Sequence, residues 1–164
     1  MIDFALTADA VAPQLLGCTL THAGVSIRLT EVEAYLGAED SAAHTFNGKT
    51  PRNAAMFGPP GRFYVYISYG IHRNVNIVCA PEGTGQGCLL RGGEIIEGAD
   101  IAFARRGTTD FHNLARGPGN LGKALGFTLE DNHQPIQIVE RTSEPEWVRG
   151  PRIGISKNKE AALR

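Results

Sequence analysis

The sequence of 164 residues predicts a single domain of the α+β class, with a curved, mostly antiparallel sheet and short helices around it. Two observations lead to this prediction. Short segments that alternate apolar and polar residues outnumber the helical segments, and the helices fall between them at irregular intervals. The 20 glycines and nine prolines are scattered without a repeat, which is typical of a fold with many turns.

The first predicted elements are a helix and a long strand. The helix covers residues 7–16, with Thr7 as its N-cap and Gly17 just past its end, although Pro13 removes one hydrogen bond from its interior. The strand covers residues 25–35, because apolar and polar side chains alternate along its first half.

The middle of the chain predicts a short helix and a hairpin. The helix begins at Thr50 and Pro51, which suit the cap and the first helical position. Two strands, residues 62–68 and 72–80, meet at Tyr69-Gly70 and form the hairpin. The remaining predicted elements are strands at residues 87–91, 134–141 and 152–156 and a helix over residues 119–125.

Charge is distributed unevenly although the net charge is only −1. Residues 1–45 hold one base and six acids, whereas residues 41–81 hold four bases and no acid. Phosphate binding depends on local charge, so this basic stretch is consistent with a polyanion-binding face. A solvated surface without a partner explains the same pattern.

Cysteine usage and the N-terminus predict a cytoplasmic protein. Cys18, Cys79 and Cys88 are few, odd in number and widely spaced, which indicates reduced thiols. We expect no secretory signal and no membrane span, because no apolar run approaches the roughly 20 residues that a span needs. The histidines and cysteines lack the close pairing of metal ligands, so we expect no metal site.

Two strand segments carry candidate chemistry. Glu31, Glu33 and Tyr35 share one face of their strand, and carboxylates on a half-buried strand need partners. An exposed face with two solvated acids is the alternative. Tyr64 and Tyr66 also share a face, which suits either stacking on bases or a cross-strand aromatic ladder.

The glycine-rich segment 116–124 is not predicted to bind and hydrolyse a nucleotide. It satisfies G-x-x-x-x-G-K, but Ala124 stands where a P-loop needs Ser or Thr for magnesium.

Taken in order, several segments resemble the alkyladenine (3-methyladenine) DNA glycosylase family, in the form unrelated to the helix-hairpin-helix glycosylases. The segments that carry the resemblance are residues 31–37, 39–44, 50–53, 56–57, 64–70, 74–77, 89–91, 115–121 and 150–155. Family members usually continue past the last segment with a strand that bears aromatic residues and arginine, whereas this chain stops at Arg164. We expect this difference to affect the stability of the sheet and part of the binding to DNA.

The resemblance implies a monofunctional enzyme that flips a damaged purine out of double-stranded DNA and hydrolyses its N-glycosidic bond, without a cofactor. The expected substrates are 3-methyladenine, 7-methylguanine, hypoxanthine and ethenoadenine. We expect a monomer, associated with the nucleoid in a bacterium or located in the nucleus of a eukaryote.

The resemblance also implies roles for individual residues. Glu33 corresponds to the general base and Arg91 to the residue that holds the attacking water. The base pocket is expected to consist of Tyr35, His44, Tyr66 and Asn76. Tyr69 corresponds to the side chain that intercalates into the DNA. Contacts to the DNA backbone and groove are expected from Arg52, Met56, Arg73, Arg116 and Lys123.

Two alternatives remain open from the residues alone. Glu31 and Glu33 lie two residues apart on a strand, about 6.6–6.8 Å at the backbone, which is near the carboxyl separation of inverting sugar hydrolases. A nucleic-acid-binding module without catalysis would use the basic stretch and the tyrosines, and it would leave Glu33 without a role.

Overall fold

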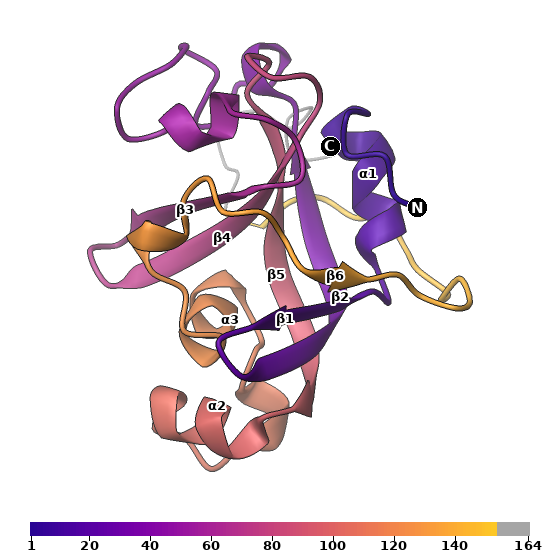
Figure 1. Cartoon of the computed structure of the whole chain (residues 1–164), viewed down its shortest axis with the longest axis vertical. Coiled ribbons are helices and arrows are strands. Elements are labelled where there is room, and N and C mark those ends of the chain that lie inside the picture. Colours follow the sequence, from indigo (N-terminus) through magenta and orange to yellow (C-terminus); the bar gives the residue numbers. More distant parts are fainter. Residues whose placement is uncertain (154–164) are drawn as a thin grey trace.

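The computed structural model describes residues 1–153, which form three α-helices, six strands and four short 3-10 helices (Figure 1). The α-helices are α1 (Ala8–Leu15), α2 (Ala99–Arg106) and α3 (Pro118–Ala124). The strands are β1 (Thr19–His22), β2 (Val25–Tyr35), β3 (Phe63–Ser68), β4 (His72–Cys79), β5 (Gln86–Glu97) and β6 (Ile138–Val139). The 3-10 helices are η1 (Gly37–Glu39), η2 (Ala54–Phe57), η3 (Phe111–Asn113) and η4 (Leu129–Asp131).

All six strands belong to one antiparallel sheet with the order β3-β4-β5-β2-β1-β6. The long strands β2 and β5 run side by side through the centre of the molecule (Figure 1), and their register shifts near Glu31. The predicted α+β class with an antiparallel sheet is therefore confirmed.

Neighbouring rows of paired residues give the sheet two chemically different faces. One row crosses four strands on the core face and is buried throughout: Phe63, Ile77, Cys88 and Ala34. The next row points to the opposite face and consists of Tyr64, Asn76, Leu89 and Glu33, of which all but Leu89 carry a polar group. Because successive side chains of a strand alternate between faces, a single register fixes both the core and the polar face.

Two helices cover the core face. Val11 and Leu15 of α1 and Leu121 of α3 are fully buried in the same hydrophobic cluster as the apolar row. A second, smaller cluster lies on the polar face and consists of Ala55, Met56, Tyr64 and Val78, with Tyr66 packed against it. The polar face therefore has its own apolar support.

Several predicted elements are confirmed. Thr7 occupies the N-cap position of α1, and Gly17 follows with a left-handed φ of 83°. The long strand predicted over residues 25–35 is β2, the hairpin is β3–β4, and the predicted helix over residues 119–125 overlaps α3.

Three predicted elements differ in extent. The helix expected from Thr50 is reduced to η2, although Thr50 and Asn53 exchange the side-chain to backbone hydrogen bonds of a capping box, at 2.7 and 3.3 Å. The strand expected over residues 134–141 is reduced to β6, since the Gln134 carbonyl instead accepts a bond from the Phe63 amide of β3.

The strand expected over residues 87–91 continues to Glu97. Gly92 and Gly93 interrupt its apolar pattern, but they are needed for close pairing with β2. A Cβ added at Gly93 would lie 2.8 Å from Cδ1 of Ile27 and 3.1 Å from the Arg28 carbonyl oxygen. The glycines therefore belong to the strand rather than to a turn.

The prediction of a strand over residues 152–156 is wrong at its first two residues. Arg152 and Ile153 are not in a strand, and residues 154–156 lie outside the described residues. The strand β1 and the helix α2 are additional to those predicted, as are the 3-10 helices η1, η3 and η4. The helix α2 starts at Gly98, which has a φ of 75° and offers no capping side chain, so the usual start signal is missing.

The three cysteines are buried and form no disulfide, and Sγ of Cys79 lies 3.8 Å from Sγ of Cys88. Among residues 1–153, no helix has the length and apolar character that crossing a membrane requires.

Candidate active site

Glu33 is a buried carboxylate on the polar face of the sheet, with 7% of the residue exposed. The Tyr35 hydroxyl donates to Oε2 of Glu33 over 2.8 Å. The backbone amide of Ile153 donates to Oε1 over 3.1 Å. A carboxylate has about four lone-pair sites, so these donors compensate its burial and still leave acceptor capacity.

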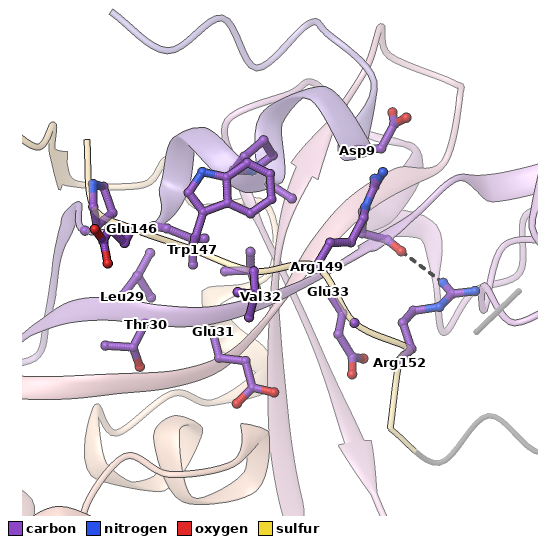
Figure 2. Close-up of a pocket in the computed structure, with 18 of the residues that line it drawn as sticks. Asp9, Leu29, Thr30, Glu31, Val32, Glu33, Glu146, Trp147, Arg149 and Arg152 are labelled. Carbon is purple, nitrogen blue, oxygen red and sulfur yellow. Dashed lines mark hydrogen bonds between the residues drawn. The ribbon is translucent and has the colours of Figure 1, made fainter. Parts of the chain in front are cut away.

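Arg91 bridges the two acids of β2. Its Nε lies 3.0 Å from Oε1 of Glu31 and 3.4 Å from Oε1 of Glu33. The guanidinium side chain is 14% exposed, whereas the side chain of Glu31 is 50% exposed. Figure 2 shows the carboxylates of Glu31 and Glu33 on the same side of β2, as the strand alternation predicts.

Tyr35 lies between Glu33 and Arg152. Burial raises the pKa of the Tyr35 phenol far above its ordinary value, and the neighbouring charge of Glu33 raises it further. The phenol therefore stays protonated and acts as a hydrogen-bond donor to the carboxylate. The guanidinium carbon of Arg152 stands 4.4 Å from the centroid of the Tyr35 ring.

Three aromatic rings form the opposite side of the site. The His44 and Tyr66 rings meet edge to face with centroids 4.3 Å apart, and the Tyr64 and Tyr66 centroids are 5.6 Å apart. Burial raises the pKa of Tyr64 to about 12, and burial is also the main cause that raises the pKa of Tyr66. Burial and the charge of Arg52 lower the pKa of His44, so the imidazole is neutral at pH 7.

Two asparagines of β4 complete this side. The amide nitrogen of Asn74 donates to the Tyr66 hydroxyl over 3.1 Å. The amide nitrogen of Asn76 donates to the Tyr64 carbonyl over 3.3 Å, and the residue is 3% exposed. Since Asn76 pairs with Leu89 and Leu89 pairs with Glu33, the asparagine and the acid lie on the same face.

The structure therefore brings one group of predicted site residues together on the polar face. This group consists of Glu33, Arg91, Tyr35, His44, Tyr66 and Asn76. The site residues come from four adjacent strands and from the loop after β2, so the sheet fixes most of their positions.

Met56 departs from the prediction. It is expected at the DNA groove, but its side chain is buried at 3% exposure in the small cluster beneath Tyr64. A Cβ at Gly87 would lie only 2.7 Å from Met56 Sδ, so the thioether fills the space that this glycine leaves. We correct the prediction: Met56 supports the site from below and is not a groove contact.

Tyr69 stands at the tip of the β3–β4 hairpin, away from this group. It is 94% exposed and has a left-handed φ of 51°, and it is followed by Gly70 with a φ of 72°. A tyrosine in this position buries almost nothing and bears backbone strain, so a contribution to the stability of the fold does not explain its presence. Ile71 beside it is 67% exposed.

The predicted basic contacts are distributed around the site and the hairpin. Arg52 is exposed and donates to the carbonyl of Ile67, near the tip of the hairpin, over 2.7 Å. Arg73 and Lys123 line a second groove of about 440 Å³ beside the hairpin tip. Arg116 is exposed and adjoins β5 through a bridge at Gly92.

A groove of about 780 Å³ adjoins Glu33 on the side of β2 and α1. One wall is Val32 and Leu16, and the other is the extended segment that contains Trp147 and Ile153. The Trp147 ring lies over β2 on the side away from the two carboxylates (Figure 2). The buried acid is thus enclosed by the C-terminal segment as well as by the sheet.

Sequence reasoning missed three residues of the site. Asp40 and Arg152 form a buried ion pair next to Tyr35, and Asn74 holds the Tyr66 hydroxyl. Arg152 falls within a segment that carried the family resemblance, but nothing in the local sequence links it to Asp40, 112 residues away.

The arrangement suits general-base chemistry beside a flat, aromatic ligand. A buried carboxylate with fixed donors can take a proton from water, and the neighbouring arginine can orient that water. Neutral imidazole and phenol groups can stack and hydrogen-bond with a planar ligand. Among residues 1–153, no group of three or more His, Cys, Asp or Glu side chains is placed to bind a metal ion.

Comparisons with known proteins agree with this chemistry. The family model described as "Methylpurine-DNA glycosylase (MPG)" matches residues 2–164. Three relatives carry the name "Putative 3-methyladenine DNA glycosylase". The Corynebacterium efficiens protein is 67% identical, covering 99% of this chain and 88% of its own length. The Cutibacterium acnes protein is 49% identical, with coverage of 100% and 93%, and the Rhodopseudomonas palustris protein is 48% identical, with coverage of 94% and 77%.

Proposed function

Because this chain belongs to the methylpurine-DNA glycosylase family, we propose that it excises 3-methyladenine and related damaged purines from double-stranded DNA and thereby starts base excision repair. The related lesions are 7-methylguanine, hypoxanthine and ethenoadenine. The single observation that carries this proposal is the buried Glu33 carboxylate, held by Tyr35 at 2.8 Å on the sheet face that also carries Tyr66 and Asn76.

In the proposed reaction, Glu33 activates a water molecule against C1′ of the deoxyribose. The water oxygen forms a bond to C1′, and one water proton passes to the carboxylate. The C1′–N9 bond breaks, and its electron pair leaves with the purine. The sugar is cationic at the transition state, so a nearby carboxylate stabilises it as well as accepting the proton. A cationic methylated purine leaves as a neutral base and needs no acid.

The pocket residues have separate proposed roles. Tyr35, His44 and Tyr66 receive the flipped base by stacking and hydrogen bonding, which replace its contacts in the duplex. Asn76 projects from the same face and is proposed to clash with the amino group of normal guanine. The binding role of His44 is supported by its neutral imidazole: Nδ1 lies 3.4 Å from the Tyr64 hydroxyl, which leaves Nε2 for a hydrogen bond to a purine edge.

Binding to the duplex is proposed to rely on the hairpin and its basic neighbours. Tyr69 enters the minor groove and fills the gap that the flipped nucleotide leaves, as apolar wedges do in other minor-groove proteins. Its 94% exposure at a hairpin tip supports this role. Phosphate contacts are proposed from Arg52, Arg73, Arg116 and Lys123, which are all exposed.

The sugar-hydrolase alternative lacks geometric support. One nitrogen of Arg91 contacts both Glu31 and Glu33, at 3.0 and 3.4 Å. The nearest oxygens of the two acids are therefore closer than the roughly 6.5–9.5 Å that an inverting sugar hydrolase keeps between its carboxyl groups. Glu31 is also half exposed, unlike its neighbour.

The decisive experiment compares Glu33→Gln with Glu31→Gln on alkylated duplex DNA. Loss of a general base lowers a rate by roughly 10²–10⁴-fold, so Glu33→Gln should lose base release by at least about 100-fold while keeping its affinity for the duplex. Glu31→Gln is the matched control and should retain most of the activity. Full activity of Glu33→Gln would refute the assignment, and binding without turnover by the wild type would favour a binding module.

A further inference from the structure

Arg152 forms the most deeply buried ion pair among the described residues. Its Nη1 lies 2.7 Å from Oδ2 of Asp40, and its Nη2 lies 2.8 Å from Oδ1, which is a bidentate pair. The two side chains are 1% and 0% exposed. Arg152 also donates to the Ala34 carbonyl at the end of β2 over 2.9 Å, the bond drawn in Figure 2.

Asp40 ties this arginine to the loop that follows β2. Its two oxygens accept bonds from the backbone amides of Leu36 and Ala42 at 3.0 and 3.1 Å. Burial alone would raise the pKa of Asp40, but the bonds from Arg152 and from these amides lower it below its ordinary value, so the carboxylate stays charged. The same loop leads to His44 in the base pocket.

The guanidinium occupies one face of a ring that belongs to the site. Arg152 stands 4.4 Å from the Tyr35 ring centroid, within the range of a cation–π contact. The Tyr35 hydroxyl reaches Glu33 at the same time. A purine that stacks on Tyr35 therefore has only the opposite ring face available.

The residue after Arg152 touches the carboxylate directly. The amide of Ile153 donates to Oε1 of Glu33 over 3.1 Å. The ion pair with Asp40 fixes the position of Arg152, which directly precedes Ile153 in the chain. Arg152 therefore sets the position of the Ile153 amide. One buried arginine thus reaches the aromatic ring, the loop to the base pocket and the general base.

From these contacts we propose that Arg152 is a positioning residue that also sets lesion preference: it holds Tyr35 from behind and weakens the stacking of cationic purines on that ring. The proposal rests on the proposed function. A cation on one face attracts the electron density of the ring, so the other face is a weaker partner for a second cation. Neutral purines are affected less, and the preference between the two lesion classes shifts accordingly.

The test measures affinity without turnover, in the Glu33→Gln background, which leaves both bases uncleaved. The quantity is the ratio of Kd for a duplex with hypoxanthine, a neutral base, to Kd for a duplex with 7-methylguanine, a cation. Arg152→Lys keeps the ion pair with Asp40 but lacks the flat guanidinium against Tyr35, and Asp40→Asn combined with Arg152→Gln removes both charges. We expect the ratio to rise by about two- to threefold in the first variant and by about three- to tenfold in the second.

Arg141→Lys is the matched control. Arg141 also anchors the C-terminal segment, through bonds of 2.7 Å to the carbonyls of Pro13 and Leu16, but it does not contact Tyr35. Its ratio should equal that of the parent. If the double variant does not fold, Arg152→Lys decides the matter.

An unchanged ratio in a folded variant, or an equal rise in Arg141→Lys, overturns the inference and leaves the proposed function intact. A wild-type enzyme that releases neither base overturns both.

Discussion

Asn76 and Glu33 lie in one row of the sheet, separated only by Leu89 of the strand between them. The proposed guanine filter and the proposed general base therefore share a rigid frame of three hydrogen-bonded strands. A shift of one residue in either pairing would move one of them to the core face. The geometry of the site is thus a property of the strand register and less of its loops.

Replacing Tyr69 at the hairpin tip should lower the affinity for DNA without lowering the stability of the protein. Tyr69→Gly should leave the melting temperature unchanged or slightly raised, because Tyr69 is 94% exposed and its φ of 51° suits glycine better. Affinity for a lesion-containing duplex should fall by about 5- to 150-fold, as expected for a loss of roughly 1–3 kcal/mol of stacking.

Thermal melting and fluorescence anisotropy with a labelled duplex measure the two effects. Ile71→Ala, at the neighbouring exposed position, is the control and should weaken binding less. Equal affinity of Tyr69→Gly and wild type would argue against insertion of Tyr69 into DNA.

Close packing under the site predicts a cost for a single added methyl group. In Gly87→Ala the new Cβ would meet Met56 Sδ at 2.7 Å and the Ile77 carbonyl oxygen at 3.0 Å. The methionine can move, but the carbonyl belongs to a paired strand. We expect a loss of about 1–3 kcal/mol in the free energy of unfolding, measured with urea.

Gly150→Ala provides the comparison, because nothing lies within 4 Å of the Cβ it would gain. Its unfolding free energy should change by less than about 0.5 kcal/mol. If both alanine variants are equally stable, the account of Met56 and Gly87 is wrong.

His44 predicts a pH dependence of stability. Burial and the charge of Arg52 hold its pKa in the folded protein below the ordinary value. The unfolded chain therefore binds more protons in the window between the folded pKa and about 6.5. The contribution of His44 to stability is complete above that window and is lost as the pH falls through it.

Unfolding free energies measured from pH 7.5 to pH 5 should decline less in His44→Gln than in the wild type. The imidazole resonances of His44 should titrate with a midpoint below about 6.5. A midpoint above that value would show that the ring is stabilised in its charged form, contrary to the environment described.

Local patterns were sufficient for the elements that depend on neighbours in sequence. The alternation along β2 placed Glu31, Glu33 and Tyr35 on one face, and the break at Tyr69-Gly70 marked the hairpin. These features follow from the period of two in a strand and from turn chemistry. They identified part of the site before any tertiary contact was known.

Other features depend on partners that are distant in sequence. Gly92 and Gly93 are typical of a turn in the sequence, yet they pair with β2. At Gly93 a glycine is needed because Ile27 approaches too closely for a side chain. The pair of Asp40 with Arg152 joins residues 112 positions apart and leaves no local periodicity to detect. Met56 lies in a segment that the family resemblance associates with DNA contact, but its side chain packs in the small cluster with Tyr64.

The hydrogen bond from Ile153 to Glu33 spans 120 positions of the chain. During synthesis on the ribosome, every strand of the sheet leaves the exit tunnel before this amide does. A nascent chain therefore carries the acid and its tyrosine partner while one donor to the acid is still unmade. The full set of donors to Glu33 therefore forms only after the strands that carry the hydrophobic core have been synthesised.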